Sequence, residues 1–387
     1  MFRSRTLATT LRNLTCHISP YKPSHTLAKM STSKASDAFK FLPQGALIQE
    51  FLIGGRNIVL SFPSPASYKS PRNPFFGENI GRLANRVSGA KIHNLNGKSY
   101  DLAANNGPNS LHGGKEGWGK KDFQGPEKCE RGGKEAVLYK YLSKDGEEGY
   151  PGTVELRMWY VMGLEKEGGV EKTSLEIEYE VELVGDEVEE TVVGVTNHRY
   201  DVACFPYYPT KDQLTVHVLC SYFNISDGPT LEGTVINVAT NLHQVTDKDD
   251  IPTGEIKPFP GMPANEDFTL GAKEPDPDHC FILNDDPASV KIDTRKEPMQ
   301  RLITLYHPGS KIHFETLSTE PAFQFYTGRG IDVPEMDGMP ARGPRSGMCI
   351  EASRYVNAVN DEKLRHMVVL KKGEKFGSRT IYRGWKD

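Results

Sequence analysis

Residues 175–183 alternate without interruption between apolar side chains and glutamate, and this pattern constrains the fold more than any other in the chain. Successive side chains of a β-strand point to opposite faces, so the pattern predicts a strand over 174–183. One face would be buried and the other would carry a solvated row of acids. The apolar positions are Leu175, Ile177, Tyr179, Val181 and Leu183, and the acidic ones are Glu176, Glu178, Glu180 and Glu182.

Further period-two segments follow one another at short spacing along most of the chain. Residues 46–53 and 57–62 flank Gly54-Gly55 and predict a hairpin. Other strands are expected at 137–142, 153–162, 191–197, 302–306, 311–317, 322–326, 366–370 and 379–385. No long amphipathic helix competes with them, and 37 glycines and 26 prolines supply frequent turns. The sequence therefore predicts an all-β protein, a sandwich or barrel with few short helices.

The N-terminal residues differ from the rest. Residues 1–37 contain several basic and hydroxyl side chains and no acid before Asp37. We interpret them as a disordered extension, either a mitochondrial transit peptide or sequence upstream of a true start at Met30. Residues 38–387 show no break in composition and are expected to form one domain, interrupted only by an insertion described below.

Composition excludes several classes of partner. The formal net charge of −4 gives no reason to expect nucleic acid, and no apolar stretch approaches the 18 residues of a membrane span. The six cysteines are scattered and form no CxxC pair. They favour a reducing compartment, the cytoplasm, or the mitochondrion if the extension is genuine. We expect a monomer or a weak dimer acting on a small molecule.

Polar residues at strand ends and in glycine-rich turns are candidates for a site. Glu351 lies in an otherwise small or apolar run, where a carboxylate would be desolvated and its pKa raised, as a general base requires. Gln324 alternates with Phe323 and Phe325 and should face away from both rings. His112 stands beside two glycines, which allow a ligand close approach. Taken singly, each of these could equally be structural, and Arg82 or Arg86 could pair with acids at the sandwich rim.

Several strings, in order, resemble the motifs of the aldose 1-epimerases, or galactose mutarotases. They are Gly81-Arg-Leu-Ala-Asn-Arg-Val, Asn109-Ser-Leu-His-Gly-Gly, Thr196-Asn-His, Ile251-Pro-Thr-Gly, Asp278-His, Phe323-Gln-Phe-Tyr-Thr-Gly and Ile350-Glu-Ala-Ser. The resemblance runs from about Phe39 to the C-terminus and implies an antiparallel β-supersandwich with a sugar in an open cleft.

The resemblance also implies a reaction and its residues. Anomers interconvert when a cyclic hemiacetal opens and recloses on its other face, which needs one proton acceptor and one proton donor. Glu351 would be the base and His198 the acid. The sugar would be held by Asn85, Arg86, His112, Tyr222, Asp278 and Gln324. No cofactor or metal is required, and the expected substrates are free hexoses such as glucose and galactose.

Other classes stay open. A retaining glycosidase would need two carboxylates about 5–5.5 Å apart, whereas the strongest acidic motif here is matched with histidines. A metal site is not supported by any HxH or HxxxH spacing. A carbohydrate-binding or catalytically impaired relative could retain Arg86 and His112 without the acid and the base.

One departure from the family pattern follows His198. The family continues Thr-Asn-His directly into Ser-Tyr-Phe-Asn, but residues 199–220 separate His198 from Ser221 here. The segment holds several aromatic and aliphatic residues and two cysteines, which is unusual for an exposed linker. We interpret it as a retained intron, or otherwise as a lineage-specific insertion.

A chain that lacks residues 199–220 is expected to anomerise sugar faster and to unfold at a higher temperature than the full chain, because the interrupted motif is restored. Polarimetry and thermal unfolding of the two chains measure this. A tryptic peptide from 199–220 in the purified native enzyme would contradict the intron interpretation.

Overall fold

Antiparallel strands build the part of the chain that the computed structural model describes, residues 34–70, 73, 76–197 and 222–387. The compact unit is Lys34–Asp387. Among its described residues the helices are 3-10 turns, the longest of them η2 (Pro65–Lys69), and none is long and apolar enough to cross a bilayer. The predicted all-β antiparallel class is confirmed. The predicted extension, apart from its last four residues, and the predicted insertion at 199–220 lie outside the described residues.

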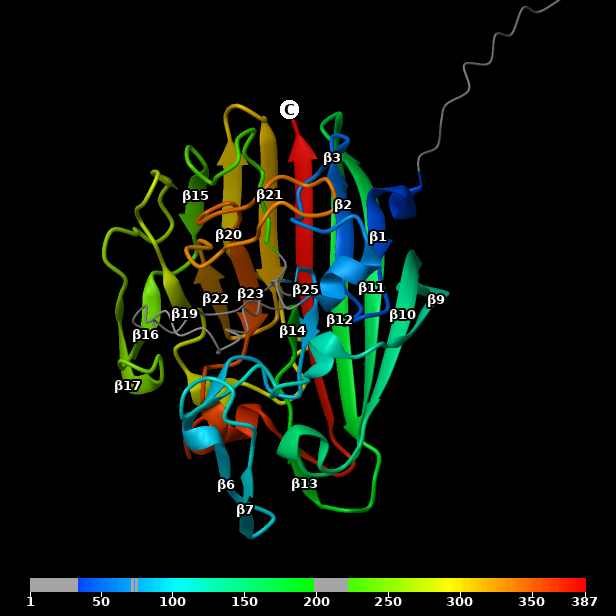
Figure 1. Cartoon of the computed structure of the whole chain (residues 1–387), viewed down its shortest axis with the longest axis vertical. Coiled ribbons are helices and arrows are strands. Elements are labelled where there is room, and N and C mark those ends of the chain that lie inside the picture. Colours follow the sequence, from blue (N-terminus) through cyan, green and yellow to red (C-terminus); the bar gives the residue numbers. More distant parts are fainter. Residues whose placement is uncertain (1–33, 71–72, 74–75, 198–221) are drawn as a thin grey trace, which may run out of the picture. The chain divides into compact units, whose positions relative to one another are not determined.

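The larger sheet has nine strands, and its long central strands run side by side through Figure 1. Their order is β18 (Phe268–Thr269), β15 (Val235–Val238), β20 (Gln300–His307), β21 (Ile312–Ser318), β25 (Lys375–Lys386), β12 (Val170–Leu183), β11 (Val154–Glu167), β10 (Lys134–Ser143) and β9 (Gln124–Arg131).

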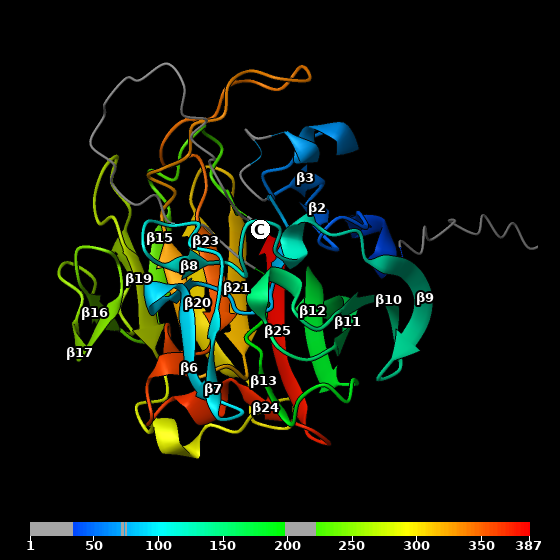
Figure 2. The same ribbon diagram turned by 60° about the horizontal axis from the view of Figure 1, so that its bottom comes forward.

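The smaller sheet has five strands and carries most of the candidate site. Their order is β17 (Pro252–Pro258), β16 (Leu242–Thr246), β19 (Asp278–Ile282), β22 (Ala322–Tyr326) and β23 (Cys349–Ser353). Smaller sheets of two or three short strands accompany them. They are β1 (Phe39–Phe41) with β2 (Ile48–Ile53) and β3 (Arg56–Asn57), β4 (Asn79–Ile80) with β14 (Thr196–Asn197), β5 (Arg86–Val87) with β8 (Ser110–Leu111), β6 (Lys91–Leu95) with β7 (Lys98–Asp101), and β13 (Glu190–Val192) with β24 (Val369–Lys371). Figure 2 shows β6 and β7 side by side.

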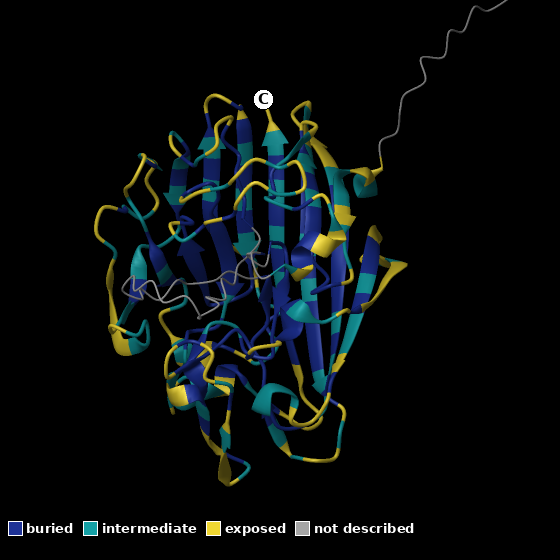
Figure 3. Ribbon diagram, viewed as in Figure 1, coloured by how far each residue is buried: buried dark blue, intermediate teal, exposed yellow. Residues whose placement is uncertain are grey.

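The main core joins the two sheets. Ile177 and Tyr179 of β12 belong to the same buried cluster as Phe323 and Phe325 of β22 and Ile350 of β23. Figure 3 shows the burial along these strands, while their exposed residues gather at turns and strand ends. Because neighbouring residues of a strand face opposite ways, the packing of Phe323 and Phe325 turns Gln324 away from this core.

Most predicted strands are present, with shifted ends. The segment 174–183 forms β12, 322–326 forms β22, and the first hairpin is confirmed, although β3 is only two residues long. The segment 191–197 was expected to be one strand but forms β13 and β14. The chain changes partner between them: Val193 N–H donates to the Val368 carbonyl, whereas Gly194 N–H donates to the Arg82 carbonyl.

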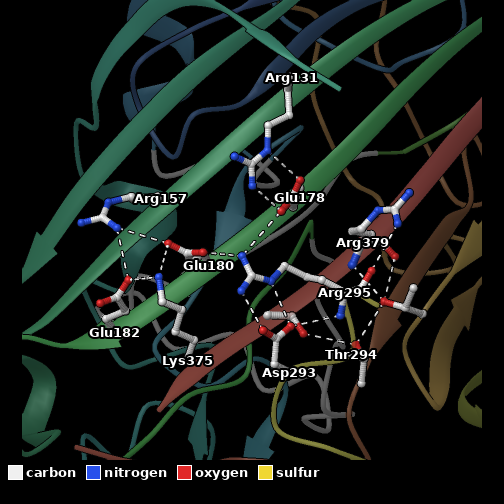
Figure 4. A network of polar contacts seen from close by, with 12 residues as sticks. Arg131, Arg157, Glu178, Glu180, Glu182, Asp293, Thr294, Arg295, Lys375 and Arg379 are labelled. Atoms are coloured by element: carbon white, nitrogen blue, oxygen red, sulfur yellow. Dashed lines mark hydrogen bonds and ion pairs between the residues drawn. The ribbon is translucent and has the colours of Figure 1, made fainter. Parts of the chain in front are cut away.

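The glutamates of β12 are not simply solvated, as the alternation suggested. They form the ion-pair network of Figure 4 with Arg131, Arg157, Arg295, Lys375 and Arg379. Burial by itself would raise the pKa of Glu180, but hydrogen bonds from Arg295 and Lys375 outweigh it and lower the pKa to about 2. Paired charges thus cover the outer face of the sheet.

Arg82 holds the segment that carries Asn85 and Arg86. Its side chain is 1% exposed, and Nη1 donates to the carbonyls of Pro151 at 2.7 Å and Gly152 at 2.8 Å. Nη2 donates to Ser143 Oγ at 2.6 Å. Burial lowers the pKa of Arg82 to about 10, so the guanidinium stays charged at neutral pH. Arg82 therefore ties this segment to the ends of β10 and β11 and does not pair with acids at the rim.

Replacing Arg82 with lysine is expected to destabilise the protein by on the order of 3 kcal/mol, because an ammonium cannot reach all these buried acceptors. Urea unfolding measures the change. The matched control is Arg301→Lys on the exposed end of β20, where a change within about 0.5 kcal/mol is expected. Equal stability of Arg82→Lys and the wild type would contradict the anchoring role.

Candidate functional site

Alternation along three neighbouring strands gathers polar side chains on one face of the five-stranded sheet. Gln324 of β22 lies opposite Glu351 of β23 on one side and opposite Cys280 of β19 on the other. Asp278 is two residues from Cys280 and shares its face. The exposed fractions are 7% for Asp278, 5% for Gln324 and 2% for Glu351, so the predicted site residues on this sheet are all buried.

A chain of hydrogen bonds links this face to the loops above it. Asn85 Nδ2 donates to Gln324 Oε1 at 3.4 Å, and Gln324 Nε2 donates to Asp278 Oδ1 at 3.1 Å. Arg329 Nη2 forms an ion pair with Asp278 Oδ2 at 3.0 Å. These hydrogen bonds fix which end of each amide carries the oxygen.

His112 is held by the backbone of Asn85. The N–H of His112 donates to the Asn85 carbonyl at 3.1 Å, and the N–H of Asn85 donates to His112 Nδ1 at 3.2 Å. Because Nδ1 is an acceptor, the neutral ring carries its proton on Nε2. Gly113 makes this arrangement possible, since a Cβ there would lie 1.9 Å from the Gly81 carbonyl oxygen. His112 thus presents a donor whose tautomer is set by the main chain.

Arg86 is 2% exposed, and its partners include Asn106 and Asp250. Its Nε donates to Asn106 Oδ1 at 3.0 Å, and its Nη2 forms an ion pair with Asp250 Oδ2 at 3.0 Å. A pocket lies here, and its lining includes Asn85, Arg86, Gln244, Asp250, Asp278 and Gln324.

Glu351 also lies near groups whose ionisation it opposes. Burial raises the pKa of the Cys280 thiol to about 12, and the nearby negative charge of Glu351 adds to the rise. Burial also raises the pKa of Tyr382, again with a contribution from Glu351. Both groups therefore stay neutral at physiological pH.

The structure tests the role of neither His198 nor Tyr222. His198 follows β14 directly in the sequence but lies outside the described residues. Tyr222 is fully buried in an aromatic cluster, with ring centroids 5.7 Å from Phe76 and 6.3 Å from Tyr326. Both roles stay predictions.

Sequence reasoning missed Gln244, Asp250 and Arg329. Asp250 directly precedes Ile251-Pro-Thr-Gly, and Arg329 directly follows Phe323-Gln-Phe-Tyr-Thr-Gly, so both adjoin strings already singled out. No local signal marks Gln244, whose Oε1 accepts the N–H of Val356 at 2.9 Å.

The comparisons with known proteins agree with this geometry. The family model for aldose 1-epimerase matches residues 30–200 and 209–383. The chain belongs to the aldose 1-epimerase family. The break in the match falls within the segment 199–220 that sequence analysis singled out.

Curated relatives include fungal and mammalian proteins. The chain is 36% identical over 344 residues to the bifunctional protein GAL10 of Pachysolen tannophilus, covering 88% of this chain and 44% of that protein. It is 31% identical over 340 residues to the galactose mutarotase of Sus scrofa, covering 84% and 83%. This family member thus spans less than half the length of the GAL10 relatives that it matches.

Solved structures share the fold. The GalM/aldose epimerase homologue of C. elegans has a TM-score of 0.69 at 19% identity, covering 90% of this chain and 95% of that one. The galactose 1-epimerase of Lactobacillus acidophilus has a TM-score of 0.66 at 22% identity, covering 90% and 91%. The expected galactose mutarotase-like fold is confirmed.

A buried carboxylate lies beside β14. Glu78 is fully buried, and its carboxylate accepts hydrogen bonds from Gln44, Asn73 and Lys120 at 2.9–3.2 Å. Its carbonyl accepts one from Asn197 at 3.4 Å. Burial raises the pKa of Glu78 to about 7 despite the attraction of Lys120.

This shift predicts a pH dependence of stability. Between pH 4.5 and 7 the folded protein holds a proton on Glu78 that the unfolded chain releases, so stability falls as the pH rises through that window. Glu78→Gln cannot titrate and should flatten the fall by on the order of 3 kcal/mol. Urea unfolding at several pH values tests this, with exposed Glu135→Gln as the matched control. An unchanged pH slope in Glu78→Gln would refute it.

Proposed function

We propose that the protein is an aldose 1-epimerase that interconverts the α and β anomers of free hexoses, galactose and glucose in particular. The observation that carries the proposal is the position of Glu351, buried opposite Gln324, which accepts a hydrogen bond from Asn85 and lines a pocket together with Arg86. A carboxylate there can exchange a proton with a sugar held by neighbouring hydrogen-bonding groups. Family membership and the names of the curated relatives support the same reaction.

The proposed mechanism assigns each proton. Glu351 accepts the proton of the anomeric hydroxyl while His198 donates one to the ring oxygen, so the bond between C1 and the ring oxygen breaks and an aldehyde forms. Rotation about the C1–C2 bond exposes the other face of the carbonyl. The hydroxyl group formed from the ring oxygen then attacks C1. His198 takes its proton back, and Glu351 returns its proton to the new anomeric oxygen. The cycle is balanced and needs no cofactor.

The surrounding groups have binding roles in this proposal. His112 Nε2–H is a donor for a sugar oxygen, since the backbone of Asn85 occupies Nδ1. Asp278 and Gln324 present an acceptor and an amide toward hydroxyl groups, and Arg86 is oriented by Asn106 and Asp250. Tyr222, fully buried in the aromatic cluster, remains a proposed binding residue.

We also propose that the protein is cytoplasmic, or mitochondrial if residues 1–37 serve as a transit peptide, and that it is a monomer or a weak dimer. Cys280 is a buried free thiol, which agrees with a reducing compartment. Light scattering after gel filtration would determine the oligomeric state.

Polarimetry of freshly dissolved α-D-galactose and α-D-glucose, with and without protein, tests the reaction directly. The expected result is faster approach to the equilibrium rotation with protein than in buffer. Calorimetric binding of galactose without acceleration would instead identify a carbohydrate-binding or catalytically impaired relative.

Glu351→Gln is expected to lower kcat by about 10²–10⁴-fold, because it keeps the shape of the side chain and removes the base. His198→Asn should be comparably severe. The matched control is Glu130→Gln on exposed β9, which should leave kcat unchanged. Near-normal activity of Glu351→Gln would refute the assignment of the base.

A further inference from the structure

The strand that carries Glu351 lies at the edge of its sheet. Within the described residues β23 is the last of the five strands and pairs only with β22 along its length. An edge strand has one row of backbone groups without a ladder partner, and buried groups of this kind need hydrogen bonds from elsewhere. The position of Glu351 therefore depends on what binds the other edge.

Two hydroxyl groups bind the carbonyls on either side of Glu351. Thr196 Oγ1 of β14 donates to the Ala352 carbonyl at 2.8 Å, and the Tyr382 hydroxyl of β25 donates to the Ile350 carbonyl at 3.3 Å. Carbonyls of residues two apart on a strand point to the same side, so both bonds act on one edge. Thr196 is 3% exposed and Tyr382 1%.

The strand β14 is itself fixed to the large sheet. Asn197 Nδ2 donates to the Gly77 carbonyl at 3.0 Å and to Asn79 Oδ1 at 3.3 Å. Asn79 Oδ1 also accepts the Tyr179 hydroxyl of β12 at 2.5 Å. A two-residue strand has little stability of its own, so these amide contacts hold it in place. The next residue in the sequence is His198.

We propose that Thr196 and Tyr382 are positioning residues that set the strand carrying the base against the strand leading to the acid and against the nine-stranded sheet. Thr196 bridges β14 and β23 directly, and Tyr382 of β25 binds the same edge of β23 two residues away. The proposal rests on the proposed function, because it assigns the two hydroxyls a role in that same reaction. Neither residue is proposed to contact the sugar.

A displacement of about 1 Å in an acid–base site can cost on the order of 100-fold in rate. Thr196→Val keeps the branched shape, removes the hydroxyl and leaves the Ala352 carbonyl without this donor. Glu351 would then lose one of the two bonds that fix its neighbours, while the groups proposed to bind sugar keep their own contacts.

The experiment compares Thr196→Val, Thr196→Ser and Tyr382→Phe by polarimetry with galactose, together with the thermal unfolding temperature of each full-length protein. Thr196→Val should lower kcat about 10- to 100-fold and leave KM within about twofold. Thr196→Ser, which keeps the hydroxyl, should recover most of kcat. Tyr382→Phe should also lower kcat, and it tests the proposal even if Thr196→Val fails to fold.

Thr294→Val is the matched control for general destabilisation. Thr294 is 2% exposed, and its hydroxyl donates to the Gly377 carbonyl at 3.2 Å on the face of the large sheet drawn in Figure 4. It should lower the unfolding temperature but leave kcat unchanged. An equal loss of kcat in Thr294→Val would assign the effect to lost stability and overturn the proposal.

Two further outcomes separate the positioning role from the function. Well-folded Thr196→Val and Tyr382→Phe proteins with unchanged kcat, beside an active wild type, would overturn only the positioning role. A wild type that does not anomerise galactose or glucose would overturn the proposed function, and the positioning role with it.

Discussion

The site depends on one constraint, the two-residue period of three neighbouring strands. In β19, β22 and β23, Phe281, Phe323, Phe325 and Ile350 fill the main core, and the residues between them must face the other way. A register shift of one residue would turn Glu351 into the apolar core. The aromatic core that stabilises the smaller sheet therefore also selects which side chains form the polar face.

That polar face has an energetic cost, because burying amides and carboxylates is unfavourable unless hydrogen bonds replace those made with water. The chain from His112 through Asn85, Gln324 and Asp278 to Arg329 supplies such bonds. A sugar rich in hydroxyl groups can form hydrogen bonds with the same donors and acceptors. The outer face of the large sheet differs, since its carboxylates are matched by arginines and a lysine, as in the pair of Glu178 with Arg131 and the pair of Glu180 with Lys375. These charges disfavour association of this surface with other strands.

Local patterns predicted the features that are themselves local. The strand over 322–326, the alternation of 174–183 and the direction of Gln324 all depend on the period of a few residues, and the structure has them. The split of 191–197 could not be predicted, because it results from a change of partner from Val368 to Arg82. The pairing of Arg86 with Asp250 likewise joins residues far apart in the sequence. Arg82 and Arg86 look equivalent in the sequence, yet one binds backbone carbonyls and the other borders the pocket.

The proposed reaction needs an acid and a base, on different segments, to keep a fixed separation. The two segments are held in place in different ways. Glu351 lies within a regular ladder, where β22 sets its height and direction. The segment before His198 belongs to a two-residue strand, and its place is set by the side chains of Thr196 and Asn197. Backbone ladders fix many residues at once, whereas side-chain contacts fix a single point and can be lost by a single substitution. The acid side of the proposed site should therefore be more sensitive to changes at a distance than the base side, and Thr196 is where the two sides meet.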